Sequence, residues 1–338
     1  MITAADAVLH AADPSVAMWA ETNFFAFSAP ELDLNGHVYC LFRPNQSVCL
    51  TTVAINDRWC KTPWDANYVD LSMHVPMGEN FDLRNYSLDS GVSVRCIEPV
   101  MKYEVAYDDG AGTKLAFQFD ALSPGYDIHD PEMDPTVAAQ AEGSDYAWGT
   151  AYNGHYDQTG YTEGELTVDG RTVSIRCIAT RDHSWGPRRE RHPSTLSWMN
   201  GAICATETPD RNPDLVFHAL CDFDDSTGGA DIRFTHGYVI EHDKLIGLSG
   251  GSAKTRRDGF QPVEVDLELQ APDGRTWNLH GEARNAFPWQ AWPNVTGFNS
   301  LMRWTREGRT GYGEIYDFYG LQRLNQLAAP RPIPRAGG

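Results

Sequence analysis

Apolar and polar residues alternate along most of the chain. The segment 164–179, GELTVDGRTVSIRCIA, shows this clearly, because apolar residues occupy every second position on both sides of Asp169-Gly170. An Asp-Gly pair between two alternating runs is typical of a β-hairpin. The pattern recurs around Asp273-Gly274 and, more loosely, around Asp109-Gly110. Further alternating runs occupy residues 37–44, 47–55, 214–223 and 231–240.

Helical spacing is confined to two short segments, residues 2–12 (ITAADAVLHAA) and 319–329 (YGLQRLNQLAA). Apolar residues elsewhere follow a period of two, which places them on one face of a strand. The sequence therefore predicts an all-β protein, built from many antiparallel strands arranged in sandwiches or barrels.

A change in pattern near the middle of the chain suggests a domain boundary. Residues 123–146 contain three prolines and many acidic residues and have no sustained period, which is typical of a long connection. We therefore expect an N-terminal β domain over 1–145 and a C-terminal β domain over 146–327. The last residues, 328–338, are rich in proline and glycine and are expected to form a loose tail.

Composition narrows the possible partners. The chain has 338 residues, of which 41% are hydrophobic, so it can bury a sizeable core. A net charge of −19 argues against nucleic acid or an anionic membrane as the main partner, because both would be repelled. No apolar run is long enough for a spanning helix, and the N-terminus lacks the features of a signal peptide. We expect a cytoplasmic protein whose partner is small and hydrophobic; the oligomeric state stays open.

The sequence lacks the motifs of several common types of binding and catalytic site. The seven cysteines are an odd number without a CxxC pair, so we expect reduced, buried thiols rather than disulfides or a cysteine zinc site. Gly-rich phosphate loops, HExxH and GxSxG are absent. Histidines on separate strands, such as His183, His218 and His236, leave a metal site open, but no spacing fixes its geometry. We expect neither an organic cofactor nor a metal.

One motif carries a resemblance to a known family. A Gly-His start with a nearby glutamine (Gly154, His155, Gln158) precedes the hairpin, and the sequence Asp-His-Ser-Trp-Gly follows it at 182–186. This segment resembles the family of the bacterial carotenoid 1,2-hydratase and the AttH proteins, which includes kievitone hydratase and fungal Diels–Alderases. Segments 21–45 and 308–318 resemble the same family more weakly.

The resemblance implies two lipocalin-like barrels packed side by side, with a hydrophobic ligand pocket between or within them. It also implies an enzyme without an organic cofactor that protonates an alkene, in a molecule such as a terpenoid, and adds water to the cation. The residues it places at the reaction site are His183, Trp185 and an acid on a following strand, where the candidates are Asp222 and Asp224.

Position along the strand separates the residues of the motif. His183 and Trp185 alternate, so they share one face and are predicted to enter the pocket together, whereas Asp182 points to the opposite face. Asp182 is therefore kept as a candidate with a supporting or structural role. Purely structural roles for His183 and Trp185, in local hydrogen bonding and in the core, stay open.

Other polar and aromatic residues are candidates for substrate contact. A carboxyl group in an aromatic pocket would stay protonated through desolvation and could serve as the acid, for which Glu314 is in reserve. The positive cluster at 188–192 is either a solvated loop or an anchor for an anionic group. The expected substrate-binding residues are His155, Trp198, Tyr316, Arg188 and Trp289.

Two other functions fit the same pattern. An isomerase, cyclase or pericyclase would use the pocket mainly to fold its substrate, and a lipid or isoprenoid carrier would bind without turnover. Catalysis requires convergent acid, histidine and tryptophan side chains in the pocket, whereas a carrier needs only apolar walls.

Overall fold

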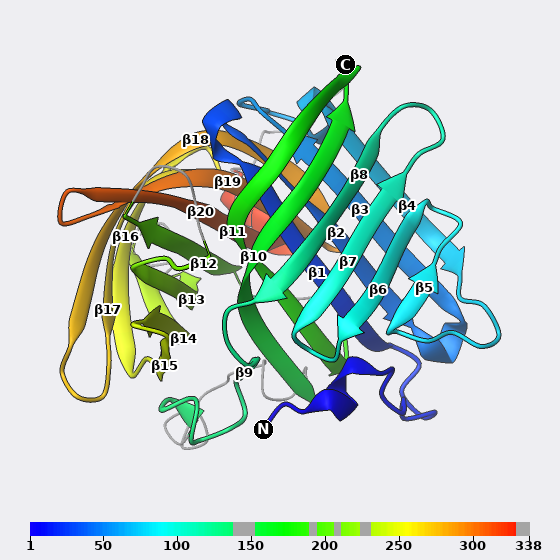
Figure 1. The fold of residues 1–338 in the computed structure, drawn as a ribbon, viewed down its shortest axis with the longest axis horizontal. Helices are drawn as coiled ribbons and strands as arrows, with labels where there is room; N and C mark the ends of the chain where they lie inside the picture. Colours follow the sequence, from blue (N-terminus) through cyan, green and yellow to red (C-terminus); the bar gives the residue numbers. More distant parts are fainter. Residues whose placement is uncertain (138–152, 189–194, 206–210, 224–230, 329–338) are drawn as a thin grey trace, which may run out of the picture.

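The chain forms two curled antiparallel β-sheets that lie side by side (Figure 1). The computed structural model describes residues 1–137, 153–188, 195–205, 211–223 and 231–328. In this part of the chain strands dominate, and the expected all-β fold of two lipocalin-like units is confirmed.

The first sheet contains the N-terminal strands and the long hairpin of the Asp-His-Ser-Trp-Gly motif. Its order is β4-β3-β2-β1-β11-β10-β8-β7-β6-β5, with β9 paired to β10. The strands are β1 (Trp19–Ala29), β2 (Leu34–Arg43), β3 (Val48–Asn56), β4 (Tyr68–Pro76), β5 (Asn85–Ser87), β6 (Val92–Glu98), β7 (Lys102–Asp108), β8 (Lys114–Ala121), β9 (Tyr126–Asp127), β10 (Gly154–Val168) and β11 (Arg171–Pro187).

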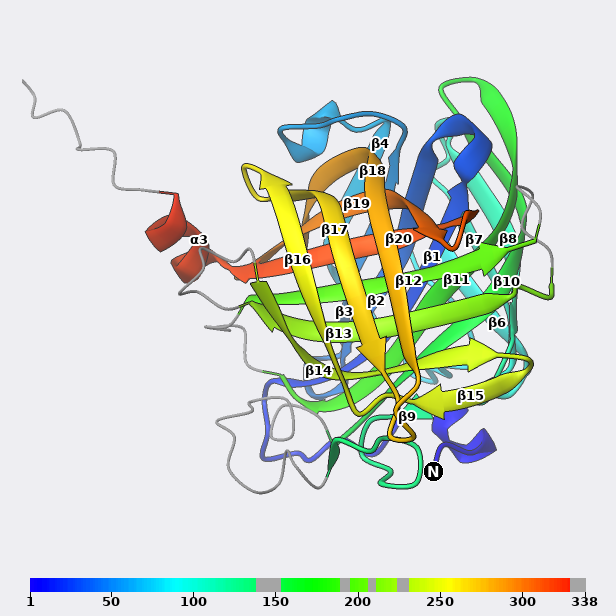
Figure 2. The same cartoon turned by 90° about the vertical axis from the view of Figure 1, so that its left-hand side faces the viewer.

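The second sheet closes on itself. Its order is β13-β12-β20-β19-β18-β17-β16-β14-β15, and β14 pairs with β13 as well as with β16 (Figure 2). The strands are β12 (Thr195–Cys204), β13 (Leu215–Phe223), β14 (Asp231–Glu241), β15 (Lys244–Gly247), β16 (Gly250–Asp258), β17 (Gln261–Gln270), β18 (Thr276–Trp292), β19 (Val295–Arg306) and β20 (Arg309–Gly320). A closed sheet leaves few unpaired edges.

The three predicted hairpins are all present. Asp169 and Gly170 join β10 to β11 with φ of 53° and 71°, the left-handed conformation of a two-residue turn in which Asp and Gly are tolerated. Asp273-Gly274 lies between β17 and β18, and Asp109-Gly110 between β7 and β8. The four further alternating runs correspond to β2, β3, β13 and β14.

Helices are few in the described residues. The expected N-terminal helix is reduced to one 3-10 turn, η1 (Ala4–Ala7), closed by a capping box between Thr3 and Asp6. The expected C-terminal helix is α3 (Leu321–Leu327). Three more 3-10 turns connect strands of the first sheet: η2 (Pro30–Leu32), η3 (Pro44–Gln46) and η4 (Pro63–Asp65).

The change of sheet does not coincide with the boundary that we expected near residue 145. The β10–β11 hairpin pairs with β8 and with β1, so it completes the first sheet instead of beginning the second. The chain passes to the second sheet between Pro187 and Thr195. The division into domains near residue 145 stays a prediction, and the change of sheet is a separate feature that lies further along the chain.

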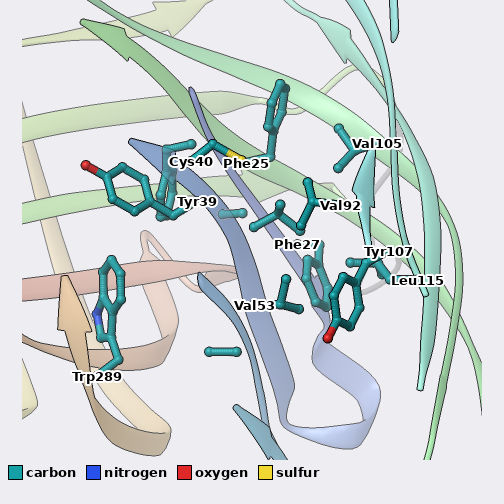
Figure 3. Packing of buried hydrophobic residues seen from close by; sticks show 14 of the residues in the cluster. Phe25, Phe27, Tyr39, Cys40, Val53, Val92, Val105, Tyr107, Leu115 and Trp289 are labelled. Carbon is teal, nitrogen blue, oxygen red and sulfur yellow. The ribbon is translucent and has the colours of Figure 1, made fainter. Parts of the chain in front are cut away.

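Each sheet encloses its own apolar core. Phe25, Phe27 and Val105 are buried inside the first sheet, and Figure 3 shows them grouped together, with Tyr39 and Trp289 standing apart on the side of the second sheet. Inside the second sheet, Phe217 packs edge-on against Trp304 with ring centroids 4.8 Å apart. Alternation along each strand thus supplies one core within each sheet and a third apolar layer between them.

Two expectations from composition can be compared with the described part of the chain. None of its helices is long and apolar enough to cross a membrane. Six of the seven cysteines are buried, as expected for core residues.

Candidate active site between the two sheets

The end of β11 sends neighbouring residues to opposite faces of the first sheet. Asp182 and Ser184 face the second sheet, and His183 and Trp185 face the interior of the first. The predicted alternation is therefore present. However, Asp182, rather than the His183–Trp185 pair, faces the space between the sheets.

A cavity of about 50 Å³ lies in that space. Both sheets contribute its walls, which are mainly aromatic and aliphatic. The lining residues are Thr22, Phe24, Tyr39, His155, Asp157, Asp182, Arg188, Leu196, Trp198, Leu220, Trp289, Ala291, Trp292 and Phe318. Four of the five expected substrate-binding residues are among them.

Of the carboxyl groups that line the cavity, Asp182 is the one whose surroundings favour the protonated form. Its Oδ1 atom is buried and makes no hydrogen bond. Burial raises the pKa of Asp182 to about 6, and the negative charge of Asp157 adds to the effect, although His155 opposes it. Asp182 therefore retains its proton at a pH where an exposed aspartate has lost it.

His155 and Asp157 form the other polar wall of the cavity. Both are buried, and His155 Nε2 lies 3.2 Å from Asp157 Oδ2. Burial alone would lower the pKa of His155, but the Asp157 carboxylate outweighs it and raises the pKa above its ordinary value. The Asp157 carboxylate also approaches the second sheet, with Oδ1 3.4 Å from His218 Nε2 and Oδ2 3.7 Å from His236 Nε2.

Arg188 lies at one side of the cavity, where its guanidinium group contacts a serine and an aromatic ring. Its Nη2 donates a hydrogen bond of 2.7 Å to Ser184 Oγ, and Ser184 Oγ in turn lies 2.8 Å from Thr22 Oγ1. The guanidinium carbon lies 5.2 Å from the ring centre of Trp292. Arg188 thus brings a positive charge beside the aromatic wall.

Glu314 and Tyr316 lie deeper between the sheets. Burial raises the pKa of Glu314 to about 7, against the opposing effect of hydrogen bonds from Asn35, Tyr316 and Asn299. Tyr316 donates a 2.8 Å hydrogen bond to Glu314 Oε2, and its ring lies 5.4 Å from that of Trp198. Glu314 is a second buried acid, but it does not line the cavity.

His183 and Trp185 belong to a separate cluster inside the first sheet. Their ring centroids are 5.4 Å apart, as expected for a pair that shares a face. His183 is 1% exposed, and its Nε2 lies 3.1 Å from Glu21 Oε1. Trp185 stacks on His10 of the N-terminal segment, with ring centroids 3.7 Å apart. Neither residue lines the cavity between the sheets.

The register of the hairpin explains how the parts of the motif depend on one another. Gly154 is the partner of Trp185 across β10 and β11. A β-carbon at Gly154 would collide with the indole ring, so the glycine provides the space for the tryptophan. Asp157 is likewise the partner of Asp182, which places the two carboxyl groups side by side.

The expected acids on the following strand are not part of this arrangement. Asp222 is half-buried near the end of β13, opposite Leu196, and does not line the cavity. Asp224 lies outside the described residues, as do Arg189, Arg191 and His192 of the positive cluster.

Glu21 and His10 are not among the residues that we expected from the sequence, whereas Asp157 follows His155 in a polar group at a strand start that could face the pocket. Glu21 has a signal in the sequence, because it is a charged residue just before the apolar run 24–27, and the structure buries all eleven residues of its strand. His10 has no such signal, since it lies in a segment without regular structure between η1 and β1. In the described part of the chain, two groups have the composition and spacing to hold a cation: His155, Asp157 and Asp182, and His10, Glu21 and His183.

Comparison with solved structures confirms the fold that the motif suggested. Kievitone hydratase from Nectria haematococca matches with a TM-score of 0.51 at 11% identity, over 94% of each chain. CghA matches with a TM-score of 0.53 at 11% identity, over 90% of this chain and 89% of its own. An AttH-like protein from Nitrosomonas europaea matches with a TM-score of 0.51 at 11% identity, over 88% and 91%. At this identity the likeness concerns the fold alone.

A search of curated proteins finds no match to the sequence. A protein family does match, over residues 3–316, which include both sheets and both polar clusters. The chain therefore belongs to the family described as "Domain of unknown function (DUF7064)".

Proposed function

We propose that this protein is a cofactor-independent hydratase or dehydratase that acts on an alkene of a hydrophobic small molecule. The observation that carries the proposal is the position of Asp182, a carboxyl group with a pKa of about 6 in the wall of an aromatic cavity. Acid-catalysed hydration needs a proton donor of this kind beside rings that stabilise a cation. The hydratase among the proteins of similar fold agrees with this choice.

The reaction uses few groups. The Asp182 carboxyl transfers its proton to one alkene carbon, and the π electrons form the new C–H bond, which leaves a carbocation on the other carbon. Trp198 and Trp289 present aromatic surface to the positive charge. A water molecule held by the polar wall of His155 and Asp157 attacks the cation and forms the C–O bond. The proton that this water loses returns to the Asp182 carboxylate, and the enzyme is restored.

The size of the cavity sets a condition on binding. A volume of about 50 Å³ accommodates a few water molecules, whereas sites for drug-sized ligands occupy about 300–1,000 Å³. A terpenoid-sized substrate therefore has to displace lining side chains. Trp292 is only half-buried, whereas Trp198 and Trp289 are buried, so Trp292 is the ring that we expect to move. The movement breaks the 2.5 Å hydrogen bond from its indole Nε1 to Tyr39 Oη.

A pericyclase is the second candidate. Arg188 places a guanidinium group beside the cavity, where it can donate hydrogen bonds to a substrate carbonyl and so polarise it. Such a reaction rearranges bonds within the substrate and takes up no water.

Incubation with hydrophobic alkenes in heavy-oxygen water, followed by mass spectrometry, tests the proposal. A hydratase incorporates one heavy oxygen atom into each product molecule. Conversion without incorporation would favour the pericyclase. Saturable quenching of tryptophan fluorescence with no product from any bound alkene or alcohol would indicate a carrier.

A further inference from the structure

The group of His10, Glu21 and His183 lies inside the first sheet, apart from the proposed active site. Three different segments supply it: the N-terminal segment, β1 and β11. The possible ligand atoms of the three side chains all lie within 4.8 Å of one another. Glu21 and His183 are almost completely buried, while His10 is half-buried.

Both imidazole rings direct one nitrogen to the same carboxylate oxygen. His10 Nδ1 lies 2.8 Å from Glu21 Oε1, and His183 Nε2 lies 3.1 Å from it. His183 Nε2 is buried and has no hydrogen-bond partner in the described structure, so its contact with Glu21 is close without being a hydrogen bond. The other oxygen, Glu21 Oε2, accepts a 2.9 Å hydrogen bond from the His10 backbone N–H.

The opposite nitrogen of each ring is fixed by an acceptor. His183 Nδ1 lies 2.7 Å from the Thr22 carbonyl oxygen, which can only accept, so Nδ1 carries a hydrogen. In the neutral ring, Nε2 then presents its lone pair to Glu21. His10 Nε2 lies 3.3 Å from Asp6 Oδ1. Outer contacts to a carbonyl and to a carboxylate are those that orient metal-bound histidines.

We propose that His10, Glu21 and His183 bind one divalent transition-metal ion, with Zn²⁺ as the preferred ion. Imidazole and carboxylate ligands suit Zn²⁺, whereas Ca²⁺ and Mg²⁺ take oxygen ligands. Two histidines and one glutamate form a known zinc ligand set that leaves a position for water. The ion links the N-terminal segment to β1 and β11, and it takes the place of the proton in the 2.8 Å hydrogen bond between His10 Nδ1 and Glu21 Oε1.

Calorimetric titration of chelator-treated full-length protein with Zn²⁺ is the direct test. We expect one ion per chain, and a visible absorption spectrum typical of nitrogen and oxygen ligation when Co²⁺ replaces Zn²⁺. His10→Ala is expected to remove this binding. Asp6→Asn removes the carboxylate from the outer contact of His10 and leaves one amide oxygen that can still accept from the Thr3 N–H, so it is expected to weaken the binding about 10- to 100-fold.

Two controls locate the ion. His280→Ala removes an exposed histidine whose Nδ1 lies 2.7 Å from Asp266 Oδ1, and it should leave the affinity unchanged. His155→Ala removes a ligand of the other group that could hold a cation and should leave the single high-affinity site intact. Absence of saturable binding in the wild type would overturn the proposal. Loss of binding in His155→Ala but not in His10→Ala would also overturn it.

Stability provides a second measurement that does not depend on substrate. Zn²⁺ should raise the melting temperature of the wild type and of His280→Ala but not that of His10→Ala, because binding to the folded state alone stabilises it. His10 and Asp6 are partly exposed and lie outside both sheets, so these variants are expected to fold. An equal rise in His10→Ala would contradict the assignment.

Discussion

Asp182 and His183 are adjacent in the sequence, yet their side chains enter different sites on opposite faces of the first sheet. Asp182 lines the cavity between the sheets together with His155 and Asp157. His183 lies inside the first sheet, with Nε2 3.1 Å from Glu21 Oε1. Substitutions at the two positions should therefore have different effects. A change at Asp182 should lower the catalytic rate, and a change at His183 should weaken metal binding and reduce stability.

The first prediction concerns the proposed proton donor. Asp182→Asn keeps the shape of the side chain but cannot donate the proton, so turnover should fall about 10²- to 10⁴-fold, the usual contribution of a general acid. Binding of the alkene, measured by tryptophan fluorescence, should change little. The matched control is Asp266→Asn, because Asp266 has a largely exposed side chain on the second sheet. Full activity in Asp182→Asn would exclude Asp182 as the acid.

The second prediction concerns the pH dependence of the rate. Hydration requires protonated Asp182, whose pKa is raised to about 6 by burial. The value of kcat/KM should therefore be constant at low pH and fall tenfold per pH unit well above pH 6. Glu314→Gln separates this group from the other buried acid, whose pKa is about 7. If the fall of kcat/KM at high pH is lost in Glu314→Gln but kept in Asp182→Asn, Glu314 is the acid in place of Asp182.

The third prediction concerns stability. The pKa of Asp182 is higher in the folded protein than the ordinary value of 3.8, so the folded state binds the proton more tightly than the unfolded state. Stability is lost as the pH rises from about 4 through 6, and the total is of the order of 3 kcal/mol at about 1.4 kcal/mol per pKa unit.

Asp182→Asn removes this titration. Urea unfolding should show that the variant is more stable than the wild type at pH 8, with a smaller advantage at pH 5. An advantage that does not change between these two pH values would show that Asp182 has an ordinary pKa.

The fourth prediction concerns the close contact between Gly154 and Trp185. Gly154→Ala places a methyl group within the indole ring and should destabilise the protein by about 1–3 kcal/mol, the usual cost of overpacking. Since Trp185 stacks on His10, the variant should also bind Zn²⁺ more weakly. Chemical unfolding and zinc titration measure the two effects.

Gly250→Ala is the control for this variant. A β-carbon at Gly250 meets only Gln270 Oε1, at 3.8 Å, so the change should be nearly neutral. Equal stability losses at the two positions would refute the packing explanation.

The local sequence was sufficient for three hairpins and for the four further strands β2, β3, β13 and β14. A two-residue period and an Asp-Gly pair fix a hairpin without any knowledge of distant residues, and all three predicted turns are present. The same period showed that Asp182 and His183 face opposite ways and that His183 and Trp185 share a face. The N-terminal segment differed, because the spacing of 2–12 is helical but only residues 4–7 form a 3-10 turn. Short isolated helices gain little stability without tertiary packing.

The sequence by itself determined the strand pattern, the hairpin register and the set of polar residues available to the sites. Only the tertiary structure decided which face of β11 meets the second sheet, because period two defines two faces without saying which one another sheet will cover. It placed Asp182 in the cavity and His183 beside Glu21. It also joined His10 to Glu21 and His183, since contacts between separate segments follow from the packing of whole sheets and leave no local pattern.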